Sequence, residues 1–202
     1  MTRWYREKKR EHFYKEAKRV GYRARSAFKL QQIQQRFQII TKRAVVVDLG
    51  AAPGGWSQIA SDLVGEEGTV IAADLSSIKP LNNVHCIQGD VTQPETITRL
   101  KQLMDTRKAD VVLSDMSPDI SGNYSVDQAR SAYLCECALS AAIQLLEPGG
   151  NFVCKIFEGE DTKGFLEKVR RHFTSVRTFA PEATRKSSSE VYIIAKRYKN
   201  AS

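Results

Sequence analysis

The chain has 202 residues, 42% of them hydrophobic and 27% charged, a composition typical of one globular domain. No apolar run approaches the roughly 18 residues of a membrane-spanning helix. The basic start lacks the apolar core of a secretory signal, so we expect neither membrane insertion nor secretion. The four cysteines show neither a disulfide framework nor metal-ligand spacing, which favours a reducing, cytoplasmic setting.

The net charge of +8 is concentrated at the start of the chain. Residues 1–29 hold 11 Lys or Arg and 3 Glu, whereas the 20 basic and 20 acidic residues of 30–202 cancel. The aromatic residues interleaved with these charges are Trp4, Tyr5, Phe13, Tyr14, Tyr22 and Phe28. Lys and Arg neutralise phosphates, and aromatic rings stack on unpaired bases, so we predict an RNA-contacting arm at 1–29. The alternative is an amphipathic helix whose aromatic side chains pack on the domain.

From residue 26 onward, the hydrophobic pattern predicts one compact α/β domain at 30–202. Residues 26–37 have the apolar spacing of a helix, and short apolar runs then alternate with helical stretches. The predicted strands are 44–49, 69–75, 84–88, 109–115, 151–157, 175–180 and 190–197. The predicted later helices lie near 57–64, 95–106, 125–147 and 162–172. This alternation indicates a mostly parallel sheet with helices on both faces.

A glycine-rich loop follows the first predicted strand, in the sequence VVVDLGAAPGGWSQ of residues 45–58. Its glycines let the backbone turn tightly and leave room for a ligand at the start of the next helix. Ala52 and Pro53 stand where a dinucleotide-binding loop needs glycine to approach a pyrophosphate, so an NAD-dependent oxidoreductase is disfavoured. A glycine-rich turn that binds no ligand is the alternative.

Two acids follow the next two predicted strands and favour an adenosine ligand. Asp74 ends the second strand, where an acid typically hydrogen-bonds ribose hydroxyls, and Asp90 ends the third, within reach of an adenine amine. S-adenosylmethionine carries adenosine without phosphate, and a carboxylate such as Asp48 would favour its sulfonium cation. The pattern therefore predicts an S-adenosylmethionine site.

The chain resembles the FtsJ/RrmJ family of RNA ribose 2'-O-methyltransferases in five motifs that occur in the family's order. They are RSAFKL (25–30), VVDLGAAPGGWSQ (46–58), LSDMSP (113–118), LEPGGNFVCKIFEG (146–159) and SSSEVYIIA (187–195). The resemblance covers nearly the whole chain. Phe28 stands where the family commonly has tyrosine or tryptophan, which is a mild change of aromatic residue. It implies a Rossmann-like S-adenosylmethionine-dependent methyltransferase fold with a seven-stranded, mostly parallel sheet.

The same resemblance implies the site residues. The implied catalytic tetrad is Lys29, Asp115, Lys155 and Glu190, and the implied cofactor residues are Gly54, Trp56, Asp74, Asp90 and Asp115, with no metal. Asp115 and Lys155 end the fourth and fifth predicted strands, and Glu190 begins a strand that we expect to run back beside them. The alternative is that these four charges form ordinary surface ion pairs.

A ribose hydroxyl must lose its proton to attack a methyl group, and Lys155 is the candidate acceptor. A lysine with the ordinary pKa of about 10.4 is charged at neutral pH and cannot accept a proton. Burial and a neighbouring cation such as Lys29 favour the neutral amine, whereas Asp115 and Glu190 favour the ammonium. The sequence leaves this balance open, and a charged Lys155 would instead orient the hydroxyl and stabilise the oxyanion.

The resemblance also implies the substrate, a uridine in the A-loop of large-subunit rRNA, within the ribosomal subunit. Two alternatives stay open: methylation of the tRNA anticodon loop, and a non-catalytic RNA-binding ribosome-assembly factor. Base methylation is disfavoured because the loop after the fourth strand reads Asp115-Met116-Ser117-Pro118, without the Pro-Pro-aromatic motif or a nearby cysteine nucleophile. We expect a monomer that binds neither DNA nor membranes.

Overall fold

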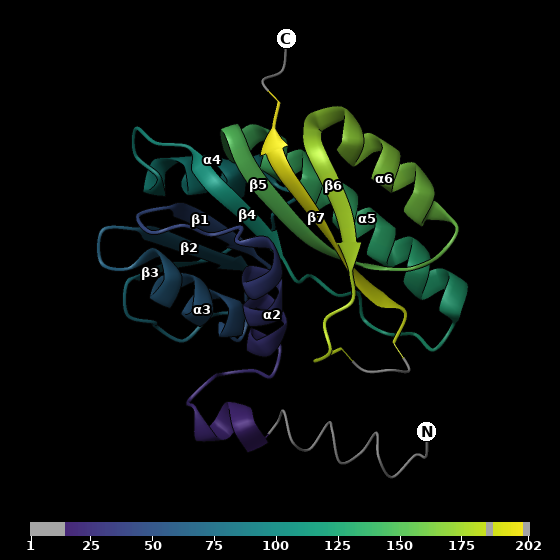
Figure 1. The fold of residues 1–202 in the computed structure, drawn as a ribbon, viewed down its shortest axis with the longest axis horizontal. Helices are drawn as coiled ribbons and strands as arrows, with labels where there is room; N and C mark the ends of the chain where they lie inside the picture. Colours follow the sequence, from purple (N-terminus) through teal and green to yellow (C-terminus); the bar gives the residue numbers. More distant parts are fainter. Residues whose placement is uncertain (1–14, 185–187, 200–202) are drawn as a thin grey trace.

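The computed structural model describes residues 15–184 and 188–199, which form a seven-stranded sheet with helices on both faces (Figure 1). The strands, in the order β3-β2-β1-β4-β5-β7-β6, are β1 (Val45–Leu49), β2 (Thr69–Asp74), β3 (Val84–Gln88), β4 (Ala109–Ser114), β5 (Leu146–Phe157), β6 (Phe173–Phe179) and β7 (Glu190–Tyr198). The helices are α2 (Ala27–Phe37), α3 (Gly55–Val64), α4 (Pro94–Leu103), α5 (Tyr124–Leu145) and α6 (Asp161–His172). The predicted α/β architecture is confirmed.

Strand direction brings the carboxyl ends of β1 to β5 to one edge of the sheet. β1 pairs in parallel with β2 and β4, β2 with β3, and β4 with β5. β7 runs antiparallel to both β5 and β6, so that its first residue, Glu190, lies opposite Phe157, the last residue of β5. The predicted return of the Glu190 strand is confirmed, and ligands of such sheets bind at this carboxyl edge.

Two hydrophobic layers hold the helices against the sheet. In β1, Val45, Val47 and Leu49 face the layer that includes buried side chains of α4, α5 and α6, whereas Val46 faces the layer of α2 and α3. All five residues of β1 are buried, because the central strands of a parallel sheet are covered on both faces. α2 thus packs on the face of the sheet that it shares with α3.

The boundary between α5 and β5 differs from the prediction. The predicted helix extends to residue 147 and the predicted strand begins at 151, but α5 ends at Leu145 and β5 begins at once at Leu146. The ladder with β4 jumps from the pair Ala109–Leu146 to the pair Val111–Asn151. Gly149 takes a φ of 92°, and the preceding proline cannot continue a helix, so these residues form an irregularity within an extended segment.

Residues 1–14 of the predicted arm, which include Trp4, Tyr5, Phe13 and Tyr14, lie outside the described residues. Residues 15–19 are helical, and the rings of Tyr22 and Phe28 meet edge to face at 5.5 Å. Within residues 15–184 and 188–199, no helix is long and apolar enough to cross a membrane. The same ranges contain no group of three or more His, Cys, Asp or Glu placed to hold a metal ion.

Candidate active site

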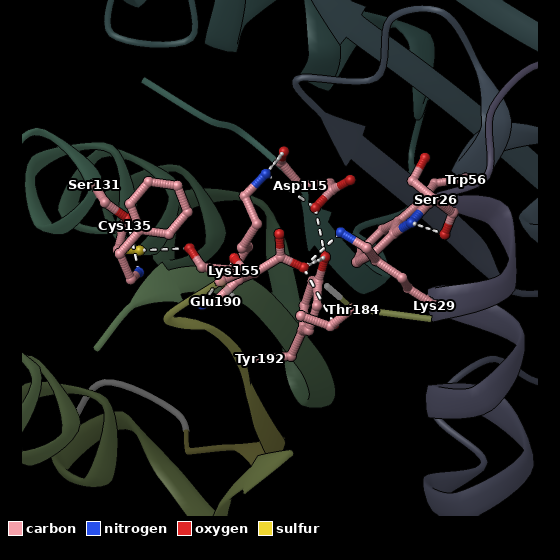
Figure 2. A network of polar contacts seen from close by, with 12 residues as sticks. Ser26, Lys29, Trp56, Asp115, Ser131, Cys135, Lys155, Thr184, Glu190 and Tyr192 are labelled. Atoms are coloured by element: carbon pink, nitrogen blue, oxygen red, sulfur yellow. Dashed lines mark hydrogen bonds and ion pairs between the residues drawn. The ribbon is translucent and has the colours of Figure 1, made fainter. Parts of the chain in front are cut away.

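The four residues of the predicted tetrad lie together at the carboxyl edge of the sheet (Figure 2). Lys29 projects from α2, Asp115 follows β4 directly, and Glu190 is the first residue of β7. Lys155 lies two residues before the end of β5, slightly earlier than predicted. Parallel strands and an antiparallel neighbour therefore bring together residues that are up to 161 positions apart.

Each lysine of the tetrad is paired with a carboxylate. The Lys29 Nζ atom lies 2.5 Å from Glu190 Oε1, and the Lys155 Nζ atom lies 3.2 Å from Asp115 Oδ1. Lys155 Nζ also donates to the Asp115 backbone carbonyl oxygen at 2.6 Å. Both lysines are only 6% exposed. Fully buried lysines are rare and need compensating partners, so this arrangement differs from the surface ion pairs of the alternative interpretation.

Tyr192 joins the two ion pairs, and sequence reasoning missed it. Its hydroxyl oxygen lies 2.7 Å from Asp115 Oδ1 and 3.0 Å from Glu190 Oε1. Burial, followed by the charges of these two carboxylates, raises the pKa of Tyr192 well above its ordinary value, so the hydroxyl stays protonated and donates. A signal was available, because Tyr192 lies two positions after Glu190 and therefore points to the same face of the strand.

The network is a continuous chain of polar contacts that runs from Lys29 through Glu190, Tyr192 and Asp115 to Lys155 (Figure 2). A lysine stands at each end, each is paired with a carboxylate, and the neutral Tyr192 hydroxyl joins the two carboxylates at the centre. Such a fully connected buried network fixes the position of each charged group.

A cleft of about 360 Å³ lies beside the network, at the carboxyl ends of β1 to β4. Three of the predicted cofactor residues, Asp74, Asp90 and Asp115, line this cleft. The other two lie elsewhere. Gly54 packs against Arg23, and Trp56 is 2% exposed, donates its indole N–H to the Ser26 carbonyl oxygen and packs on Tyr192.

The acids at the ends of β2 and β3 are held by backbone amides and one hydroxyl. Asp74 accepts hydrogen bonds from the Ala52 and Ser76 amides, at 3.0 and 2.7 Å, and so ties the loop after β1 to the loop after β2. Asp90 accepts from the Thr92 amide and hydroxyl, both at 2.8 Å, and these bonds lower the pKa of Asp90. Both carboxylates face a cleft in which oxygen acceptors can bind ligand hydroxyl or amine groups.

Asp48 lies buried in β1, below the glycine-rich loop of residues 50–55, which is called the cofactor loop. Its Oδ2 atom accepts a 2.6 Å hydrogen bond from the Ser57 hydroxyl, and its Oδ1 atom is buried without a partner among the described residues. The pKa of Asp48 is raised to about 7, chiefly by burial and also by the charges of Asp115 and Asp74, while the hydrogen bond from Ser57 opposes the shift. Asp74 and Asp115 line the cleft above Asp48, so the negative charge gathered here fits a positively charged ligand.

We expect the Asp48→Asn variant to be more stable than the parent at pH 8, because it avoids burying a charged carboxylate, and we expect this advantage to shrink as the pH falls. Because the folded protein holds the Asp48 proton more tightly than the unfolded chain, the group's stabilising contribution is complete below the ordinary pKa of 3.8 and is lost as the pH rises through about 7. The free energy of unfolding of the variant, relative to the parent, should therefore fall by about 1.4 kcal/mol for each unit that the pH drops below 7. Urea unfolding at pH 8, 6 and 5 measures it. A gap that stays constant across this range would contradict a buried, titrating Asp48.

Comparison with known proteins identifies the class of enzyme. The family described as FtsJ-like methyltransferase matches residues 22–198 of the chain. The chain belongs to this family. It is therefore a methyltransferase, and the FtsJ-like domain includes the whole sheet, the tetrad and the cleft.

Relatives of this FtsJ-like enzyme are similar over most of their length. A protein of Halorubrum lacusprofundi named ribosomal RNA large subunit methyltransferase E is 48% identical over 189 residues, which are 93% of this chain and 70% of the relative. A protein of the same name from Methanocaldococcus jannaschii is 44% identical over 200 residues, 97% of this chain and 82% of the relative. A Plasmodium falciparum crystal structure described as a ribosomal RNA methyltransferase has a TM-score of 0.78 at 26% identity, covering 88% of this chain and 98% of that one. These matches confirm the Rossmann-like methyltransferase fold.

Proposed function

We propose that the protein transfers a methyl group from S-adenosylmethionine to a ribose 2'-hydroxyl of large-subunit rRNA, with a uridine of the A-loop as the target. The observation that carries this proposal is the buried Lys-Asp-Lys-Glu network beside a cleft lined by carboxylates. The names of the relatives, ribosomal RNA large subunit methyltransferase E, support the choice of RNA. The free thiols of the four cysteines support a cytoplasmic enzyme.

The cleft residues supply the groups that this cofactor requires. Asp74 would accept hydrogen bonds from the adenosine ribose, and Asp90 would accept one from the adenine amine. Asp115 would lie toward the sulfonium, with Asp48 beneath the loop adding negative potential. When bound, the cofactor supplies an electrophilic methyl group. Neither Gly54 nor Trp56 lines the cleft, so they would affect cofactor binding indirectly, through the shape of the loop.

Lys155 is the proton acceptor in this proposal. Two of the positions around its Nζ atom point to the Asp115 carbonyl and carboxylate oxygens. The remaining position carries a lone pair in the neutral amine and can take the proton of the 2'-hydroxyl as that oxygen attacks the methyl carbon. Transfer needs oxygen, carbon and sulfur in line, and the fixed Lys155 amine supports that alignment.

Lys29 assists without contacting Lys155 directly. Its ammonium is held by Glu190, and the polar chain through Tyr192 and Asp115 carries its influence to the acceptor. The tetrad therefore combines an acceptor with charged and polar groups that hold it in place.

Lys29 also connects the chemistry to the basic arm at 1–29. The arm continues directly into α2, which carries Lys29 in its first turn. RNA bound by the arm through phosphate contacts and stacking would therefore lie next to the tetrad. This continuity supports an RNA substrate.

The proposed substrate can be tested by offering the enzyme two kinds of RNA. Labelled S-adenosylmethionine is incubated with undermethylated ribosomal subunits and, separately, with tRNA, and the methylated nucleoside is mapped. We expect label in one uridine of large-subunit rRNA and none in tRNA. Label only in tRNA would overturn the rRNA proposal, and cofactor binding without transfer to either RNA would indicate a non-catalytic assembly factor.

A further inference from the structure

The glycines of the cofactor loop face protein atoms, where the sequence predicts room for a ligand. A side chain at Gly50 would collide with Met116, whose Cγ atom would lie 2.4 Å from the added carbon. At Gly54 the same space holds Leu81, at 2.9 Å, and the Arg23 guanidinium, at 3.2 Å. At Gly55 it holds Ala24, also at 3.2 Å. Gly54 and Gly55 therefore allow an N-terminal segment to pack directly on the loop.

That segment crosses the start of α3 and consists of residues 21–26, the strap. The Gln58 side chain accepts from the Arg23 backbone amide at 2.8 Å and donates to the Gly21 carbonyl oxygen at 3.1 Å. The Ser26 carbonyl accepts from the Trp56 indole at 2.9 Å. The strap is thus fixed to the first turn of α3 at both of its ends.

The Arg23 side chain extends from the strap to two loops at once. Its guanidinium donates to the carbonyl oxygens of Pro53 at 3.2 Å, Lys79 at 2.6 Å and Pro80 at 2.6 Å. Pro53 belongs to the loop after β1, and the other two belong to the segment after β2. Both loops border the cleft, because Ala52 lines it from the first and Asp74 and Ser76 line it from the second.

We propose that Arg23 is a positioning residue for the cofactor, because it sets the separation of two of the loops that line the cleft. The identity of the cofactor rests on the function proposed above. The planar guanidinium can bond three carbonyl oxygens in fixed directions, which a single ammonium group cannot reproduce. The charge pattern alone assigns Arg23 to RNA binding with the rest of the arm, and the two assignments make opposite predictions.

Binding of S-adenosylhomocysteine, measured by calorimetry without RNA, tests the proposal. We expect Arg23→Gln to weaken this binding about tenfold, because three hydrogen bonds to the loops are lost. Arg23→Lys keeps the positive charge but loses the planar set of guanidinium donors, and we expect it to weaken binding severalfold as well. In turnover assays both variants should raise the KM for S-adenosylmethionine, while kcat at saturation and the KM for RNA stay near those of the parent.

The matched control is Arg19→Gln, which removes an exposed arm charge paired with Glu16 and should leave cofactor binding unchanged. If Arg23 instead contacts RNA phosphate, Arg23→Gln will raise the KM for RNA with unchanged S-adenosylhomocysteine binding, and Arg23→Lys will be nearly normal. That result would overturn the positioning role. A parent protein that fails to bind S-adenosylhomocysteine at all would instead contradict the proposed function. Thermal unfolding of each variant separates a local change in the cleft from loss of the fold.

Discussion

The Lys155→Ala variant is expected to lose methyl transfer by about a thousandfold or more while it binds S-adenosylmethionine almost normally. A positioned proton acceptor contributes roughly 10²- to 10⁴-fold to a rate. Lys29, the other amine of the network, pairs with Glu190 and not with Asp115, so it cannot replace Lys155. Cofactor affinity should persist because Lys155 does not line the cleft. Single-turnover transfer and calorimetric binding measure the two effects separately.

The control for this variant is Lys168→Ala, which removes an exposed lysine that pairs with Glu136 at 2.7 Å on the surface of α6. Removing Lys155 also leaves Asp115 without its buried partner, which is destabilising. Lys155→Met fills more of the vacated space and serves as a second variant, with assays run below the unfolding transition of both. Retention of more than about a tenth of the parent rate in folded protein would contradict the role of Lys155 as acceptor.

Asp115→Asn is expected to weaken binding of S-adenosylmethionine more than binding of S-adenosylhomocysteine. The two ligands differ in one methyl group and in the positive charge of the sulfonium, so the difference between their losses reports the charge of Asp115. Because Asp115 lines the cleft and would lie toward the sulfonium, we expect a differential loss of at least about tenfold, which corresponds to about 1.4 kcal/mol. The asparagine keeps an acceptor for the Tyr192 hydroxyl.

Asp119→Asn is the matched control, because Asp119 is exposed on the same loop, four residues later. It should change neither affinity. Equal losses for the two ligands in Asp115→Asn would show that Asp115 acts through shape and hydrogen bonding, and would remove the electrostatic argument for a cationic cofactor.

Much of the site follows from the sequence because parallel strands end at one edge. Asp74, Asp90 and Asp115 each follow or end a predicted strand, and the structure places all three in one cleft. The prediction that the strand of Glu190 returns beside the fifth strand also holds, since β7 is antiparallel to β5. Both results depend only on the direction of the strands and on which strands are neighbours.

Contacts between distant side chains could not be predicted in the same way. Arg23 bonds carbonyl groups 30 to 57 residues away, and charge alone assigns it to RNA. The directions of the glycine hydrogens in the cofactor loop depend on tertiary packing, so room for a ligand could not be distinguished from room for the strap. The raised pKa of Asp48 likewise depends on complete burial, which one position in an apolar run does not specify.

The location of the transferred methyl group tests the central claim most directly. A 2'-O-methyl group removes the hydroxyl that attacks the neighbouring phosphodiester in alkali, so labelled rRNA methylated at this oxygen leaves an alkali-resistant dinucleotide. After incubation of the protein with labelled S-adenosylmethionine and undermethylated ribosomal subunits, we predict that the label resides in one such dinucleotide, with uridine at its 5' position. Label released entirely as mononucleotides would place the methyl group on a base and contradict the account.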